Sequence, residues 1–168
     1  GIPEDIYARL VEIAVRAGKE TILDTSGELL RQGIRACPTI IKPNRKELEY
    51  IIGHRLRDRE ELKEAAGVIQ KTGVPLVAVS LGEKGLMLAG RSGCLYAKTP
   101  KVKAENTVGC GDSVVAALAM QRIAGASEEE MVRRAAALSA ANATTFENGD
   151  IPLSLEEELY RDIVVERI

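Results

Sequence analysis

The chain alternates between segments of helical periodicity and short apolar segments, and this alternation limits the folds that it can adopt. The clearest case is residues 59–73, an amphipathic segment that runs into the apolar segment 74–81, "VPLVAVSL". Earlier segments repeat the order, with helices expected at 3–18, 27–36 and 45–53 and strands at 20–24 and 38–43. Consecutive strands joined by helices run parallel, so the pattern predicts an α/β fold with a mainly parallel sheet flanked by helices.

Three further features complete this outline. Residues 81–100 have short apolar runs broken by glycine-containing turns, which predicts an antiparallel hairpin at the edge of the sheet. The remaining third is helical in pattern, with helices expected at 111–125, 127–145 and 154–164. Capping boxes are expected for the last two, formed by Ser127 with Glu130 and by Ser154 with Glu157. In the first segment, one face carries Ile6, Leu10, Ile13 and Ala14, which predicts an amphipathic helix.

Composition narrows the class of protein. Hydrophobic residues make up 45% of the 168-residue chain and the formal net charge is −2, which favours a soluble globular protein with no nucleic-acid partner. The longest purely apolar run, 114–120, is far shorter than a membrane span, so no membrane association is expected. The three cysteines form no CxxC pair, which is typical of a reducing compartment and predicts a cytoplasmic protein.

The segment "GCGDSVVAAL" places a Gly-x-Gly turn directly before a predicted helix. Such a turn lets backbone N–H groups approach an anion, and the positive end of the helix dipole favours negative charge there. Two interpretations of Asp112 remain open on the residues alone. It is an ordinary acid at a helix start, or it accepts a hydroxyl proton in phosphoryl transfer, a reaction that mainly requires positioning and charge stabilisation.

The segment "KPNRKEL" also has two interpretations. Asn44 and Glu47 have the spacing of a capping box at a helix start. Alternatively, Lys42, Asn44 and Glu47 line a ligand crevice at the carboxyl end of a strand. There, the lysine would meet phosphate, and the other two side chains would hold Mg²⁺ through water molecules, because magnesium dehydrates reluctantly.

The segment "VSLGEKG" is either a plain turn with Gly82 and Gly85 at unusual backbone angles, or a strand end whose Ser80 and backbone amides contact a nucleotide. Asp24 follows an earlier strand in the same way, but its position gives weaker support for a functional role. His54 lies beside arginines just past a helix end, and we expect it to be solvated.

The order of four segments, "DTSG", "KPNRKEL", "VSLGEKG" and "TVGCGDS", resembles the ribokinase-like sugar kinases of the phosphofructokinase B family. The combination is most similar to the branch that contains 1-phosphofructokinase and tagatose-6-phosphate kinase. The resemblance implies a ribokinase-like fold in which residues 1–168 form the C-terminal, nucleotide-binding portion of a single domain. The N-terminal strands, the lid and most sugar-binding residues of that domain have no counterpart in this sequence.

The resemblance also implies an activity, the ATP-dependent and Mg²⁺-assisted phosphorylation of a sugar-phosphate hydroxyl. The acceptor would be a phosphorylated ketohexose of the fructose-1-phosphate or tagatose-6-phosphate type. By this resemblance, Asp112 is the proton acceptor, and the anion hole is formed by the amides of Gly109, Cys110 and Gly111. Cys110 stands where the family usually has alanine, and we expect its alkylation to block activity.

The remaining implied sites concern the nucleotide and ions. Asn44 and Glu47 lie near the metal and the phosphates with Lys42, and the nucleotide contacts are Ser80, Leu81, Gly82 and Gly85. The helix carrying Asn142 closes over the adenine. As in some members of the family, K⁺ would be bound by backbone carbonyls around Asn106 and Val108.

Because the chain begins with Gly1, we expect a fragment of a longer protein or a processed product. The resemblance implies that this portion is inactive alone, since the lid and the acceptor site are missing, and that the whole protein pairs through the lid as a homodimer. The alternative is a non-catalytic nucleotide-binding or interaction module that keeps the motifs without the acceptor site. A dehydrogenase-type dinucleotide domain is disfavoured, because Val114 replaces the third glycine of that fingerprint.

Overall fold

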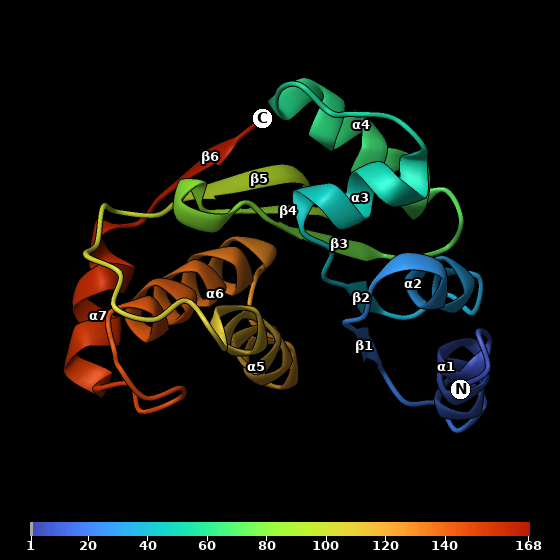
Figure 1. Cartoon of the computed structure of the whole chain (residues 1–168), viewed down its shortest axis with the longest axis horizontal. Helices are drawn as coiled ribbons and strands as arrows, with labels where there is room; N and C mark the ends of the chain where they lie inside the picture. Colours follow the sequence, from blue (N-terminus) through green and yellow to red (C-terminus); the bar gives the residue numbers. More distant parts are fainter. Residues whose placement is uncertain (1) are drawn as a thin grey trace. The chain divides into compact units, whose positions relative to one another are not determined.

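The computed structural model describes residues 2–168, and that range contains seven α-helices, six β-strands and one 3₁₀ helix (Figure 1). The α-helices are α1 (Ile6–Arg16), α2 (Gly27–Ile34), α3 (Arg45–Ile52), α4 (Arg59–Gln70), α5 (Cys110–Ile123), α6 (Glu128–Ala143) and α7 (Leu153–Asp162). The strands are β1 (Ile22–Leu23), β2 (Ile40–Ile41), β3 (Leu76–Ser80), β4 (Leu86–Gly90), β5 (Gly93–Lys98) and β6 (Val164–Arg167). The 3₁₀ helix spans Gly82–Lys84.

The chain divides into two compact units. The first unit contains the described residues up to Ser80, together with Leu88–Cys94 and Ile168. The second contains Leu81–Met87 and Leu95–Arg167. The strands are ordered β1-β2-β3-β4-β5-β6, and the architecture is the predicted α/β arrangement of a mixed sheet flanked by helices.

Parallel pairing organises the first unit. Ile22 of β1 pairs with Ile40 of β2, which in turn pairs with Leu76 of β3, and both ladders are parallel. The core of this unit is made of fully buried side chains from the strands and the helices α2, α3 and α4, among them Leu30, Ile40, Ile41, Leu48, Leu62 and Ile69. The predicted helix–strand alternation and its parallel outcome are therefore confirmed for this part of the chain.

Helices dominate the second unit, where α6 lies beside both α5 and α7 (Figure 1). The contacting face of α6 is made of small buried residues, Ala135, Ala136, Ala137, Ala140 and Ala141, which allow close helix packing. A charged cluster holds α7: Nη1 of Arg134 lies 2.9 Å from both carboxylate oxygens of Glu156, and its guanidinium stacks 3.9 Å from the Tyr160 ring centroid. The buried Glu156 is thus compensated by a cation.

The C-terminal expectations were partly wrong. Ser127 accepts a hydrogen bond from the backbone N–H of Glu130 and caps α6 at the predicted start, which is one of the two bonds of the predicted capping box. The last helix instead begins at Leu153 with Pro152 as its N-cap, so Ser154 lies inside the helix and does not start it. The helix ends at Asp162, and the residues after it form β6, which pairs antiparallel with β5 through Lys98 and Val164. The predicted hairpin strands β4 and β5 exist, but β6 lies at the edge of the sheet.

The predicted amphipathic helix at the start of the chain is present as α1, and it contacts α2. Val11 is its buried residue, whereas Leu10 and Ile13 are 52% and 63% exposed. Within residues 2–168, no helix combines the length and apolar character that a membrane crossing requires.

The three cysteines differ in how far their thiols are buried. Cys94 of β5 is buried, and its burial raises the pKa of the thiol from 9.0 to about 11, whereas Cys37 is exposed and Cys110 is half-buried. We expect a thiol reagent at pH 8 to modify Cys37 and Cys110 quickly and Cys94 only at the rate of unfolding. The neutral Cys94 thiol stabilises the fold below pH 9, and this contribution is lost as the pH rises toward about 11.

The measurement is the time course of thiol titration with and without urea, combined with urea unfolding across the alkaline range. Cys94→Ala is the matched variant and should lose the slow phase alone. Equal reaction rates for all three thiols in the folded protein would contradict the assignment.

Candidate active site

The predicted site residues fall into two groups, one in each unit. In the first unit, Asp24 directly follows β1, Lys42 directly follows β2, and Ser80 ends β3. Because these strands are parallel, their carboxyl ends lie at one edge of the sheet, which is where open α/β sheets bind ligands. An isolated parallel bridge between Asn44 and Ser80 extends this edge, with the Ser80 N–H donating to the Pro43 carbonyl at 3.0 Å.

Lys42 is a buried cation at this edge. Its side chain is only 7% exposed, and its Nζ lies 3.2 Å from Oδ1 of Asp24. A charged side chain this deeply buried requires a partner, and Asp24 supplies it. An ammonium has three donors, so the ion pair leaves Lys42 able to donate to a phosphate oxygen as well. Asp24 therefore positions the lysine, a role for which its sequence position alone gave only weak support.

Asn44 and Glu47 form the capping box of α3. The Glu47 N–H donates to Oδ1 of Asn44 at 3.0 Å, and the Asn44 N–H donates to Oε2 of Glu47 at 2.9 Å. The capping-box interpretation of this motif is therefore confirmed. Oε1 of Glu47 and one lone pair on each bonded oxygen remain as acceptor sites beyond the two cap bonds. Among residues 2–168, no cluster of three His, Cys, Asp or Glu residues could hold a metal ion. Carboxylate and amide oxygens are ligand types that hard cations accept.

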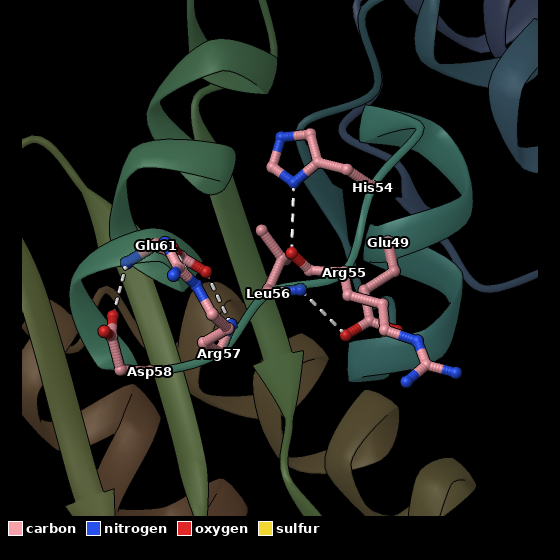
Figure 2. Close-up of polar contacts among 7 residues, drawn as sticks. All are labelled: Glu49, His54, Arg55, Leu56, Arg57, Asp58 and Glu61. Atoms are coloured by element: carbon pink, nitrogen blue, oxygen red, sulfur yellow. Dashed lines mark hydrogen bonds and ion pairs between the residues drawn. The ribbon is translucent and has the colours of Figure 1, made fainter.

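His54 lies in the loop between α3 and α4, and its side chain is exposed as expected (Figure 2). Its Nδ1 lies 3.1 Å from the Arg55 carbonyl oxygen. The carboxylates around it serve the loop: Glu49 accepts from the Leu56 N–H at 3.0 Å, and Asp58 caps α4 by accepting from the Glu61 N–H at 3.0 Å. These contacts account for the charged residues of this segment without a catalytic role.

In the second unit, the glycine-rich turn forms the start of α5. Gly109 is the N-cap and has a left-handed backbone with φ of 79°, a conformation that favours glycine. The first helical hydrogen bond runs from the Ser113 N–H to the Gly109 carbonyl at 2.8 Å. Of the N–H groups of residues 109–112, that of Cys110 donates to the Thr107 carbonyl at 3.4 Å, and the other three lie outside the hydrogen bonds of the 14-residue helix. A helix start of this kind, with the helix dipole behind it, favours negative charge.

Asp112 is the third residue of the first turn of α5, and it is exposed. The N-cap position belongs to Gly109, so Asp112 is an acid of the first turn and not the cap itself. Its carboxylate and the free N–H groups belong to the same helical turn. One short segment thus offers both an anion-binding backbone and an acceptor for a proton.

Two asparagines hold this turn against the loop that follows α6. Asn142 is 1% exposed, and its Nδ2 donates to the Val108 carbonyl at 2.9 Å, while its Oδ1 accepts from the Gly149 N–H at 2.9 Å. Asn106 donates to the Phe146 carbonyl at 3.0 Å and accepts from the Val108 N–H at 3.0 Å. The Asn142 side chain therefore faces the turn. Sequence reasoning missed this role, because Asn142 and Val108 lie 34 positions apart.

The glycines of the "VSLGEKG" segment have different environments. Gly85 has φ of 114°, and a Cβ added there would lie 2.0 Å from the Ala97 carbonyl oxygen. Gly82 has φ of 61° and is exposed, with no heavy atom of the described residues within 4 Å of an added Cβ. Leu81 precedes the 3₁₀ turn, and its N–H donates to the Gly85 carbonyl at 2.9 Å. Gly85 is thus required by packing, whereas Gly82 lies in an open part of the turn.

Comparison with known proteins identifies the family. The sequence profile of the pfkB family carbohydrate kinases matches residues 1–153. This chain belongs to the pfkB carbohydrate kinase family. A 1-phosphofructokinase from Xanthomonas campestris pv. campestris is 38% identical over 154 residues, which cover 89% of this chain and 48% of that protein.

Solved structures of pfkB-like kinases agree with this assignment. Phosphofructokinase-2 from Escherichia coli, in complex with potassium, superposes with a TM-score of 0.90 at 30% identity, over 96% of this chain and 53% of that one. Ribokinase from Arabidopsis thaliana, complexed with ribose and ATP, gives a TM-score of 0.82 at 27% identity, over 95% of this chain and 53% of that one. The ribokinase-like fold is therefore confirmed. The chain spans about half the length of these relatives.

The two glycines provide a matched test of the turn. We expect Gly85→Ala to lower the free energy of unfolding by about 2–5 kcal/mol, through backbone strain and the clash with Ala97. Gly82→Ala should cost only about 1 kcal/mol, the penalty of a left-handed alanine. Urea unfolding of the two variants measures the difference, and equal losses would contradict the packing role of Gly85.

Proposed function

We propose that this chain supplies the nucleotide-binding half of a kinase that transfers the γ-phosphoryl group of ATP to a hydroxyl of a sugar phosphate. The observation that carries the proposal is the start of α5, where free N–H groups and the exposed Asp112 carboxylate share one helical turn. Membership of a carbohydrate kinase family supports the reaction class. The Xanthomonas relative, a 1-phosphofructokinase, supports a phosphorylated ketohexose as the acceptor, of the fructose-1-phosphate or tagatose-6-phosphate type.

In the proposed reaction, the acceptor oxygen bonds to the γ-phosphorus while the bond from that phosphorus to the bridging oxygen of ADP breaks. The hydroxyl proton passes to the carboxylate of Asp112, and ADP leaves. Phosphoryl transfer has a loose transition state, so the proton is needed late and an ionised carboxylate is an adequate acceptor. The N–H groups of Gly109, Cys110 and Gly111 stabilise the negative charge on the moving phosphoryl group.

The first unit contributes a cationic side chain and oxygen donors for a metal ion. We assign Lys42 to a phosphate oxygen, because its buried ammonium keeps donors free beyond the Asp24 ion pair. Asn44 and Glu47 fit Mg²⁺ held through water, and the ion would supply charge neutralisation at the β- and γ-phosphates. Ser80 of this unit is assigned to the nucleotide. In the second unit, Leu81 and Gly82 are assigned to the nucleotide and α6 to the side of the adenine.

The alternative is a nucleotide-binding module without catalysis, because the chain covers only 48% of its 1-phosphofructokinase relative. Nucleotide binding by this chain, measured beside sugar-phosphate turnover by the full-length protein, separates the two. Nucleotide binding without turnover in the full-length protein would favour the module.

Asp112→Asn in the full-length kinase is the direct test of the proton acceptor. We expect kcat to fall by about 10²–10⁴-fold, because the amide cannot take the hydroxyl proton, with ATP affinity changed only a few-fold. The matched control is Asp162→Asn, which removes an exposed carboxylate at the end of α7 and should leave kcat unchanged. A near-normal kcat for Asp112→Asn would show that Asp112 is only an acid of the first helical turn.

Cys110 provides an independent test of the anion hole. It is the first residue of α5 and half-buried, so a bulky group on its sulfur should block the approach of phosphate to the turn. We expect alkylation to abolish turnover and ATP to slow the loss. Cys110→Ala should remain active and resist the reagent, which controls for modification of the exposed Cys37. Unchanged turnover after complete Cys110 modification would refute this placement.

A further inference from the structure

A buried tyrosine of β5 holds the turn that follows β3. Only 3% of Tyr96 is exposed, and its hydroxyl donates a hydrogen bond to the carbonyl oxygen of Lys84. A buried phenol requires such a partner, because its hydroxyl has lost contact with water. Lys84 is the last residue of the 3₁₀ helix, so this hydrogen bond joins a side chain of the sheet to the backbone of the turn.

The turn closes through hydrogen bonds between its own backbone groups. The Gly85 N–H donates to the Gly82 carbonyl at 3.0 Å, and the Leu81 N–H donates to the Gly85 carbonyl at 2.9 Å. The Lys84 carbonyl and the Gly85 N–H belong to one planar trans peptide group and therefore point in opposite directions. By holding that carbonyl, the hydroxyl of Tyr96 fixes the direction of the N–H group that closes the turn.

This peptide group has little steric restraint of its own, because the residue after it is glycine. Gly85 has φ of 114° and ψ of −148°, and glycine accepts φ of either sign, so the peptide plane can rotate without a Cβ clash. Its orientation consequently depends on the hydrogen bonds at its two ends, which involve Tyr96 at the carbonyl and Gly82 at the N–H. Gly85 is buried whereas Gly82 is exposed, so the end of the turn rests on the fold while its middle faces solvent.

We propose that Tyr96 is a positioning residue for nucleotide binding, because its hydroxyl keeps the turn at residues 81–85 closed in the conformation that contacts the nucleotide. The inference rests on the proposed function, in which Leu81 and Gly82 are assigned to the nucleotide. When a binding-competent conformation is only partly populated, the apparent affinity falls in proportion to its population. Loss of the Tyr96 hydroxyl should therefore weaken nucleotide binding and leave the transfer step unchanged.

The first experiment needs no catalysis. Amide hydrogen exchange of the full-length protein is followed by mass spectrometry in peptides that cover residues 81–87. We expect Tyr96→Phe, which keeps the ring and removes only the hydroxyl, to speed exchange there by about 2–10-fold, the effect of one neutral hydrogen bond on local opening. Exchange in α6 should not change.

The matched control is Tyr160→Phe. It removes a hydroxyl from α7 and keeps the ring against the guanidinium of Arg134, so exchange at 81–87 should stay at the wild-type rate.

The second experiment measures ADP binding by calorimetry and steady-state kinetics of the full-length kinase with fructose 1-phosphate. For Tyr96→Phe, the Kd for ADP and the KM for ATP should rise by about 2–10-fold. The kcat at saturating ATP and the KM for fructose 1-phosphate should change by less than about twofold, because the turn acts on the nucleotide alone. A merely structural role would reduce the folded fraction without changing the Kd of the folded protein. Tyr160→Phe should match the wild type in all four quantities.

The outcomes are separable. Unchanged exchange at 81–87 in Tyr96→Phe overturns the role of the hydroxyl, whether or not the protein is a kinase. Faster exchange with an unchanged Kd for ADP also overturns the inference, because the turn then opens without consequence for the nucleotide. If the wild-type protein binds no nucleotide, the proposed function is refuted, and faster exchange in Tyr96→Phe would still support closure of the turn by the hydroxyl.

Discussion

The backbone N–H groups at the start of α5 lie outside the helix's own hydrogen bonds, and much of the second unit serves to hold them in place. Gly109 turns the chain into the helix with a left-handed backbone, and Asn142 fastens the residues before it. The helix α6, which carries this asparagine, packs against α5 and buries several alanines. The proposed anion-binding role requires rigidity, because N–H groups stabilise charge only when they point at it.

The first unit contains a buried charge. Lys42 lies almost fully buried at the carboxyl edge of the parallel strands, and the carboxylate of Asp24 compensates its positive charge. The neighbouring asparagine and glutamate bond to each other's backbone, which stiffens the start of α3 while leaving oxygen lone pairs for a hydrated metal. In both units, side chains that hold the local backbone in place are combined with groups suited to phosphate or its counter-ion.

Sequence reasoning succeeded where the signal was local. The parallel strands, the cap at Ser127, the capping box at Asn44 and the glycine turn all follow from patterns within a few residues. Sequence reasoning failed where the structure depends on contacts between segments that are far apart in the sequence. The strand β6 follows a helix directly and is defined by its antiparallel pairing with β5, a strand far earlier in the sequence.

The sequence by itself determined the order of helices and strands and the chemical character of the turn, because periodicity, glycine and capping residues act on the backbone nearby. Only the tertiary structure decided what Asn142 and Asp24 do. Each is a short polar side chain whose role depends on the group that burial brings within hydrogen-bonding distance: a carbonyl at position 108 and an ammonium at position 42. A buried polar atom must find a partner, and the fold determines which one is within reach.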